Sequence, residues 1–180
     1  MTASWAMAVL VLGPLGGAAG AFAFPKGGRR LAGVAAVTAV LALLVLAREV
    51  VTNGVQLHRV GGWSAPLGID LRGDGLAVLM LAITALIAGA VTLYAPPYFL
   101  PLAGAESRDR ERWFWPLFLF LWSALNALFL SRDIFNLYVT LELLGFAAVT
   151  LVALAGKREA LTATMRYLLV SLPASLFYLM

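Results

Sequence analysis

Residues 75–95 read GLAVLMLAITALIAGAVTLYA and contain no charged side chain. An α-helix needs about 20 mostly apolar residues to cross a hydrocarbon core of roughly 30 Å, so this run predicts a membrane-spanning helix. Around it, 62% of the 180 residues are apolar and 12% are charged, with a mean hydropathy of +0.93. This composition excludes a water-soluble fold.

Five further apolar runs lie on either side of this one. Together they predict an all-α, polytopic membrane helix bundle that forms one transmembrane domain over residues 1–180. The six predicted spans are Ser4–Phe24, Leu31–Val51, Gly75–Ala95, Trp113–Ser131, Asp133–Leu154 and Leu161–Met180. No basic residue precedes the first run and Lys26 follows it, which is the wrong polarity for a signal peptide. We therefore expect the first span to remain uncleaved.

The distribution of lysine and arginine predicts the orientation. Connections with more basic residues usually lie on the cytoplasmic side. Here the odd-numbered connections hold eight basic residues, whereas the opposite side holds four. The eight are Lys26, Arg29, Arg30, Arg108, Arg110, Arg112, Lys157 and Arg158; the four are Arg48, Arg59, Arg72 and Arg132. We therefore expect the N-terminus outside, in a multi-pass protein of the plasma (cell inner) membrane.

The residue types also narrow the chemistry. The chain has no cysteine and one histidine, so it lacks the side chains for a thiolate zinc site, a Cys-ligated iron–sulfur cluster or a multi-histidine metal centre. We expect no cofactor and no bound metal. Its basic residues occur in short clusters between apolar runs, which fits topology signals and not a nucleic-acid interface. Between Thr52 and Asp74, the turn signals Asn53-Gly54 and Gly61-Gly62 predict a short hairpin over the outer face.

Only one acidic residue lies deep within a predicted span. Eight of the nine acids fall in connections or at span ends, and the ninth is Glu142. Its Cα is roughly 13 Å along the helix that begins at Asp133, near the middle of the hydrocarbon layer. A charged side chain at that depth costs about 2.5–3.5 kcal/mol and usually marks a proton or ion path. We interpret Glu142 as a proton carrier; the alternative is a purely structural hydrogen bond to a neighbouring helix.

Several residues are candidates to support Glu142. Tyr138 and Phe146 lie one helical turn away on either side, and Gly145 opens space on the same face. Ser123 and Asn126 on the fourth span are candidate hydrogen-bond partners, although polar residues of this kind also serve only in packing. Arg166 in the sixth span is a further candidate, with an interface anchor as the alternative.

These residues resemble a known family. The run DIFNLYVTLELLGF (133–146) is similar to the fifth helix of the antiporter-like subunits shared by respiratory complex I and Mrp-type cation/proton antiporters. REALTATMRYLL (158–169) resembles the family's next connection and helix. GGWSAPLGID (61–70) and DGLAVLM (74–80) resemble the Mrp D-type subunits in particular. The resemblance covers most of the chain from about residue 59 onward.

The resemblance implies a role and a larger architecture. Glu142 falls on the family's key glutamate, which pairs with a lysine of the seventh helix that modulates its protonation. Family members have a dozen or more helices, built around two inverted five-helix repeats. We therefore expect this chain to be the N-terminal part of a longer subunit, with the partner lysine beyond residue 180. The alternative is a truncated product that does not transport alone.

Three functions remain open from the sequence. The first is a proton-translocating subunit of a monovalent cation/proton antiporter, exchanging sodium or another monovalent cation for protons. The second is a proton-pumping membrane subunit of an NADH:quinone oxidoreductase or related hydrogenase, without a redox centre of its own. The third is a non-conducting structural subunit. In each case the expected partners are other membrane subunits and the lipid bilayer.

Overall fold

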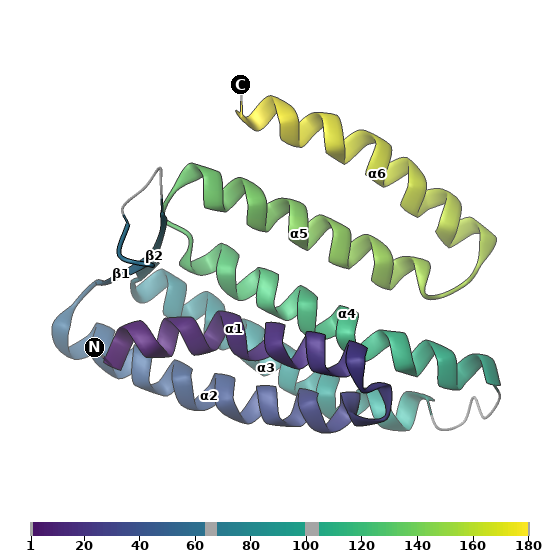
Figure 1. The fold of residues 1–180 in the computed structure, drawn as a ribbon, viewed down its shortest axis with the longest axis horizontal. Coiled ribbons are helices and arrows are strands. Elements are labelled where there is room, and N and C mark those ends of the chain that lie inside the picture. Colours follow the sequence, from purple (N-terminus) through teal and green to yellow (C-terminus); the bar gives the residue numbers. More distant parts are fainter. Residues whose placement is uncertain (1, 64–67, 100–104, 180) are drawn as a thin grey trace.

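The computed structural model describes the backbone of residues 2–63, 68–99 and 105–179, most of it helical (Figure 1). The helices are α1 (Thr2–Ala23), α2 (Gly28–Asn53), α3 (Gly75–Phe99), α4 (Ala105–Leu130), α5 (Ile134–Ala153) and α6 (Arg158–Leu179). Within the described residues, α1 to α5 are long and apolar enough to cross a membrane, and α6 does not meet that criterion. The predicted all-α membrane bundle is confirmed. The predicted sixth span ends at Met180, outside the described residues.

Several helices extend past the apolar runs from which they were predicted. The largest difference is in α4, which begins at Ala105 although the apolar run begins at Trp113. Hydropathy marks the part of a helix that matches the hydrocarbon layer, whereas backbone hydrogen bonding continues through the polar segment 106–112. Smaller extensions occur at both ends of α2. The bounds of α5, in contrast, agree with the predicted span Asp133–Leu154 to within one residue at each end.

Helix α4 is the centre of the packing, because it contacts α1, α3 and α5. α6 packs on α5 at the edge of the bundle (Figure 1). The core between α1, α2 and α4 combines small and large residues. Ala32, at the start of α2, and Trp115, on α4, are both fully buried. A Cβ atom on Gly28 would lie 2.8 Å from the Cβ of Trp115, so glycine lets α2 and α4 approach closely.

The connection between α2 and α3 forms the predicted hairpin. Strands β1 (Gln56–Val60) and β2 (Ile69–Gly73) pair antiparallel, with Arg59 opposite Asp70. Gly61 and Gly62 follow β1 with φ angles of 74° and 82°, which glycine adopts without the steric cost of a Cβ atom. The hairpin lies at the end of the bundle where α4 turns into α5 (Figure 1).

Candidate functional site

The start of α5 is fixed by capping and by the hairpin. Asp133 is the N-cap, and its Oδ1 accepts a hydrogen bond of 2.7 Å from the backbone N–H of Asn136. Its Oδ2 accepts a second hydrogen bond of 3.3 Å from the N–H of Asp70 on β2. In return, Arg132 donates its backbone N–H to the carbonyl of Asp70, at 3.1 Å. Contacts with the β2 strand therefore fix where α5 begins along the bundle axis.

Glu142 lies near the middle of α5 and is half-buried. Val149 lies two turns further on and so shares its face of the helix. Val149 is buried and lines a cavity of about 420 Å³ together with Ala163, Thr164 and Tyr167 of α6. Glu142 is therefore on the side of α5 that faces α6, roughly 10 Å closer to the hairpin end than Val149.

The surroundings of Glu142 leave its carboxylate available. No hydrogen bond or ion pair joins it to any residue that the structure describes. A Cβ atom on Gly145 would meet nothing within 4 Å, so that face of the helix is open. Tyr138 is half-buried, and Phe146 is 43% exposed. The site is an intramembrane carboxylate between two aromatic residues at the edge of the described bundle.

Ser123 and Asn126 are not placed to support Glu142. Asn126 donates to the carbonyl of Leu10 on α1 at 2.7 Å, and Ser123 donates to the carbonyl of Val11 at 2.8 Å. The Leu10 carbonyl is open to this donor because Pro14 has no N–H to donate to it. Asn126 therefore completes the hydrogen bonding of α1, and Ser123 adds a second contact to α1 beside it.

The helical geometry of α5 separates them from Glu142 as well. Thr140 is 3% exposed, and its hydroxyl bonds back to the carbonyls of Asn136 and Leu137. The buried residues Asn136 and Thr140 share one face of α5. Glu142 follows Thr140 by two residues, which turns it about 200° around the helix. The Ser123 and Asn126 contacts with α1 and the position of Glu142 correct the expectation that these α4 residues would hold the carboxylate.

Arg166 is exposed on α6, and no ion pair joins it to Glu142 in the described part of the chain. That exposure fits the interface-anchor alternative better than support of the carboxylate. No group of three His, Cys, Asp or Glu side chains that could hold a metal ion occurs among the described residues.

Two polar side chains, on α5 and α6, are buried in a way that the sequence did not predict. The side-chain nitrogen of Asn136 and the hydroxyl of Thr164 are buried without a hydrogen-bond partner among the described residues. Thr164 lies beside the cavity between α5 and α6, whereas Asn136 lies on the face of α5 that is turned away from Glu142. A polar residue in a predicted span was a usable signal for each, but its partners depend on tertiary packing that the sequence does not display.

Fold and site together define a polytopic helical membrane protein with an available carboxylate in one span. The chain is 32% identical to the D-type subunit of the Na⁺/H⁺ antiporter of Alkalihalophilus pseudofirmus and 37% identical to the N-type subunit of the NADH-quinone oxidoreductase of Desulforudis audaxviator. These matches cover 84% and 82% of this chain. These matches confirm the resemblance to the antiporter-like subunits.

The fold agrees with a solved structure of that kind. The chain superposes on part of the Mrp complex from Dietzia sp. DQ12-45-1b with a TM-score of 0.70 and 27% identity, over 97% of this chain and 33% of the other. No family model matches the sequence. The chain spans 29% of the length of each of the two curated relatives.

Proposed function

We propose that the chain is part of a proton-translocating subunit of a monovalent cation/proton antiporter complex in the plasma membrane, with Glu142 as the reversible proton carrier. The observation that carries the proposal is the half-buried carboxylate in the middle of α5, which has no partner among the described residues. The names of the relatives support the transport class.

The physical mechanism depends on the cost of charge at this depth. An ionised carboxylate within the hydrocarbon layer is expensive when no positive charge is near it. A cation that approaches within a few ångströms offsets that cost strongly, because the surroundings have a low dielectric constant. Proton binding and release at Glu142 thereby become coupled to the arrival of a positive charge. Such a charge is either a transported cation or a basic side chain.

A second candidate function is a proton-pumping subunit of an NADH:quinone oxidoreductase complex. It is favoured by the 37% identity to a subunit of an oxidoreductase with that name. The two functions differ in their energy source, since an antiporter moves protons in response to a cation gradient without any electron donor. Proton movement that requires NADH and is indifferent to sodium supports the second.

The test is cation-driven proton flux in inverted membrane vesicles that carry the intact complex, followed with a pH-sensitive dye. Glu142→Gln keeps the size and hydrogen bonding of the side chain but removes its titratable proton, and we expect flux to fall to background. Glu142→Asp should retain part of the flux. The matched control is Glu159→Gln, because Glu159 is an exposed acid in the first turn of α6. Wild-type flux in Glu142→Gln would reject the carrier and favour a non-conducting structural role.

A further inference from the structure

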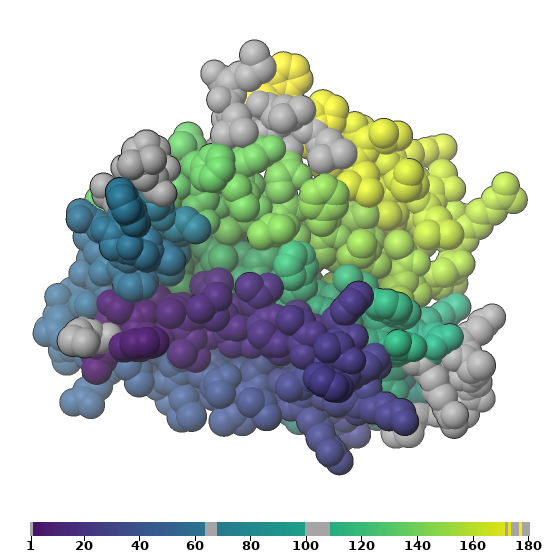
Figure 2. All heavy atoms as spheres, in the orientation of Figure 1, coloured from purple at the N-terminus to yellow at the C-terminus, as the bar shows by residue number. Residues whose placement is uncertain are grey.

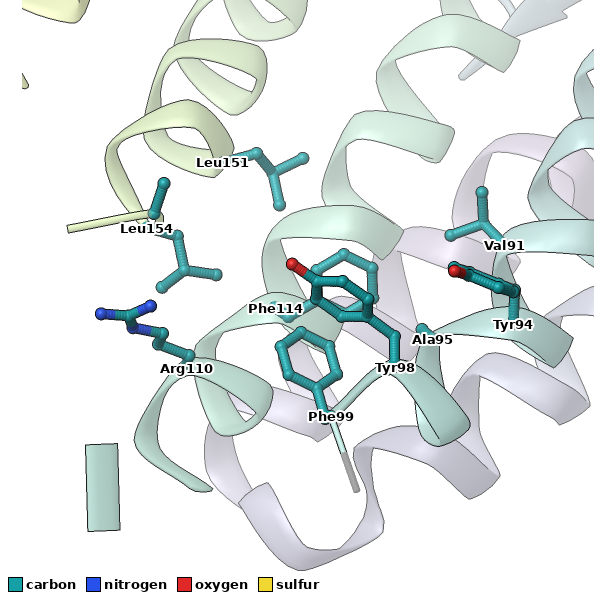
Figure 3. Close-up of a pocket in the computed structure, with 10 residues that line it drawn as sticks. Val91, Tyr94, Ala95, Tyr98, Phe99, Arg110, Phe114, Leu151 and Leu154 are labelled. Atoms are coloured by element: carbon teal, nitrogen blue, oxygen red, sulfur yellow. The ribbon is translucent and has the colours of Figure 1, made fainter. Parts of the chain in front are cut away.

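A second cavity lies at the opposite end of the bundle from the hairpin, where α3 ends and α4 begins. It measures about 350 Å³ and is bounded by α3, α4 and the last turn of α5 (Figure 3). α3 and α5 each pack on α4, which forms the floor between them. The side chains that matter for its chemistry are Tyr94, Tyr98, Phe99, Arg110, Phe114 and Leu154.

The lining of this α3–α5 cavity is amphipathic. Phe99 and Phe114 form the inner wall, with ring centroids 5.4 Å apart, and Phe114 continues the aromatic packing into the core. Tyr94 and Tyr98 are 68% and 55% exposed at the rim. Figure 3 shows the guanidinium of Arg110 beside Leu154, away from the aromatic rings. The cavity thus offers an apolar wall at one side and a cation with two phenols at the other.

The charge around the cavity favours an anionic occupant. All three odd-numbered connections meet at this end of the bundle (Figure 1). Of the described side chains there, seven are basic and three are acidic: Lys26, Arg29, Arg30, Arg110, Arg112, Lys157 and Arg158 against Asp109, Glu111 and Glu159. Basic clusters next to membrane spans attract anionic lipid head groups, and tyrosine is enriched at the level of those head groups.

The chemistry of the lining favours a lipid over a protein helix. A helix with an apolar face would cover the rim tyrosine hydroxyls without bringing an anionic group to the basic end of the bundle. An acyl chain fits a narrow apolar slot and brings its own phosphate.

We propose that the α3–α5 cavity binds one anionic phospholipid, with an acyl chain against Phe99 and Phe114 and the phosphate at Arg110. Tyr94 and Tyr98 lie at the rim, where their hydroxyls reach the head-group region. This site is separate from Glu142, and its occupancy is measured without any transport assay. The lipid fills the groove between α3 and α5 and ties both helices to α4.

The test measures lipid retained by the intact complex after purification from nanodiscs that contain equal phosphatidylglycerol and phosphatidylcholine, by native mass spectrometry. We expect the wild type to retain phosphatidylglycerol preferentially. Arg110→Gln should lower that preference about fivefold, because it removes the cation placed at the phosphate. Arg158→Gln is the matched control, since it removes an exposed charge from the same end of the bundle outside the cavity, and it should lower the preference much less.

A second variant tests the proposal by blocking the cavity instead of changing its charge. Leu154→Trp fills the cavity without changing its charge, and we expect it to lose the bound lipid altogether. A photo-crosslinking residue in place of Tyr98 should form an adduct with lipid. The proposal is overturned if Arg110→Gln keeps the wild-type preference, if phosphatidylcholine is retained equally by the wild type, or if the crosslink joins Tyr98 to a protein segment.

Discussion

Asn126 on α4 and Glu142 on α5 are polar side chains inside neighbouring helices, and their surroundings differ. Asn126 is 1% exposed and donates to the Leu10 carbonyl that Pro14 leaves without a backbone donor. Glu142 is half-buried and bonds to no described residue, beside a glycine with open space around it. The first side chain completes the backbone of another helix, whereas the second leaves its carboxylate without a partner among the described residues.

This contrast extends to the two sides of the bundle. The α1–α2–α4 side is closely packed around small residues, and the view in Figure 2 shows α1 and α2 as one continuous layer below α5 and α6. On the α5–α6 side, the Thr164 hydroxyl is buried without a described partner next to a cavity of about 420 Å³. We infer that the first side provides stability and the second provides function. Variants of matched residues on the two sides test that division.

The largest effect on stability is expected from a glycine pair. Gly28→Ala places a methyl group 2.8 Å from the Cβ of Trp115, close to the α4 backbone, so relief requires the helices to move apart. Overpacking of this kind costs about 1–3 kcal/mol. Gly145→Ala meets nothing within 4 Å and should cost nothing. The measurement is the unfolding temperature of the detergent-solubilised complex, and equal losses in both variants would contradict the proposed division.

An asparagine pair should show the next largest effect. Asn126→Leu removes the donor to the Leu10 carbonyl and should lower the stability by about 1–2 kcal/mol, near the upper end for hydrogen bonds between membrane helices. Asn136 is also buried, at 7% exposure, but its side-chain nitrogen has no described partner. Asn136→Leu should therefore be neutral or stabilising. Denaturant titration of the two variants distinguishes them, and a larger loss in Asn136→Leu would contradict the assignment.

The smallest of these effects is expected at the start of α5. Asp133→Ala removes the N-cap and the acceptor for the Asp70 N–H, at a cost of about 1 kcal/mol. Asparagine is an equally good N-cap, so Asp133→Asn should retain most of the stability. Hydrogen exchange of the first turn of α5 provides the measurement. Protection lost equally in both variants would show that the carboxylate charge matters more than the cap.

The sequence predicted the helices well and their contacts poorly. Runs such as residues 75–95 identify spans because the bilayer imposes both length and apolarity. The depth of Glu142 followed from counting residues along a regular helix. The partners of Ser123 and Asn126 did not, since they depend on how α1 crosses α4 and on the carbonyl that Pro14 leaves open. A polar residue in a span identifies a need for hydrogen bonding, but not the helix that meets it.

The most direct test measures proton flux and unfolding temperature together on the intact complex, in Glu142→Gln and Asn126→Leu. We predict that Glu142→Gln loses cation-driven proton flux and keeps the wild-type unfolding temperature. Asn126→Leu should unfold at a lower temperature and, below it, transport at nearly the wild-type rate. Wild-type flux in Glu142→Gln, or loss of its flux only together with unfolding, would contradict the role of Glu142 as the proton carrier.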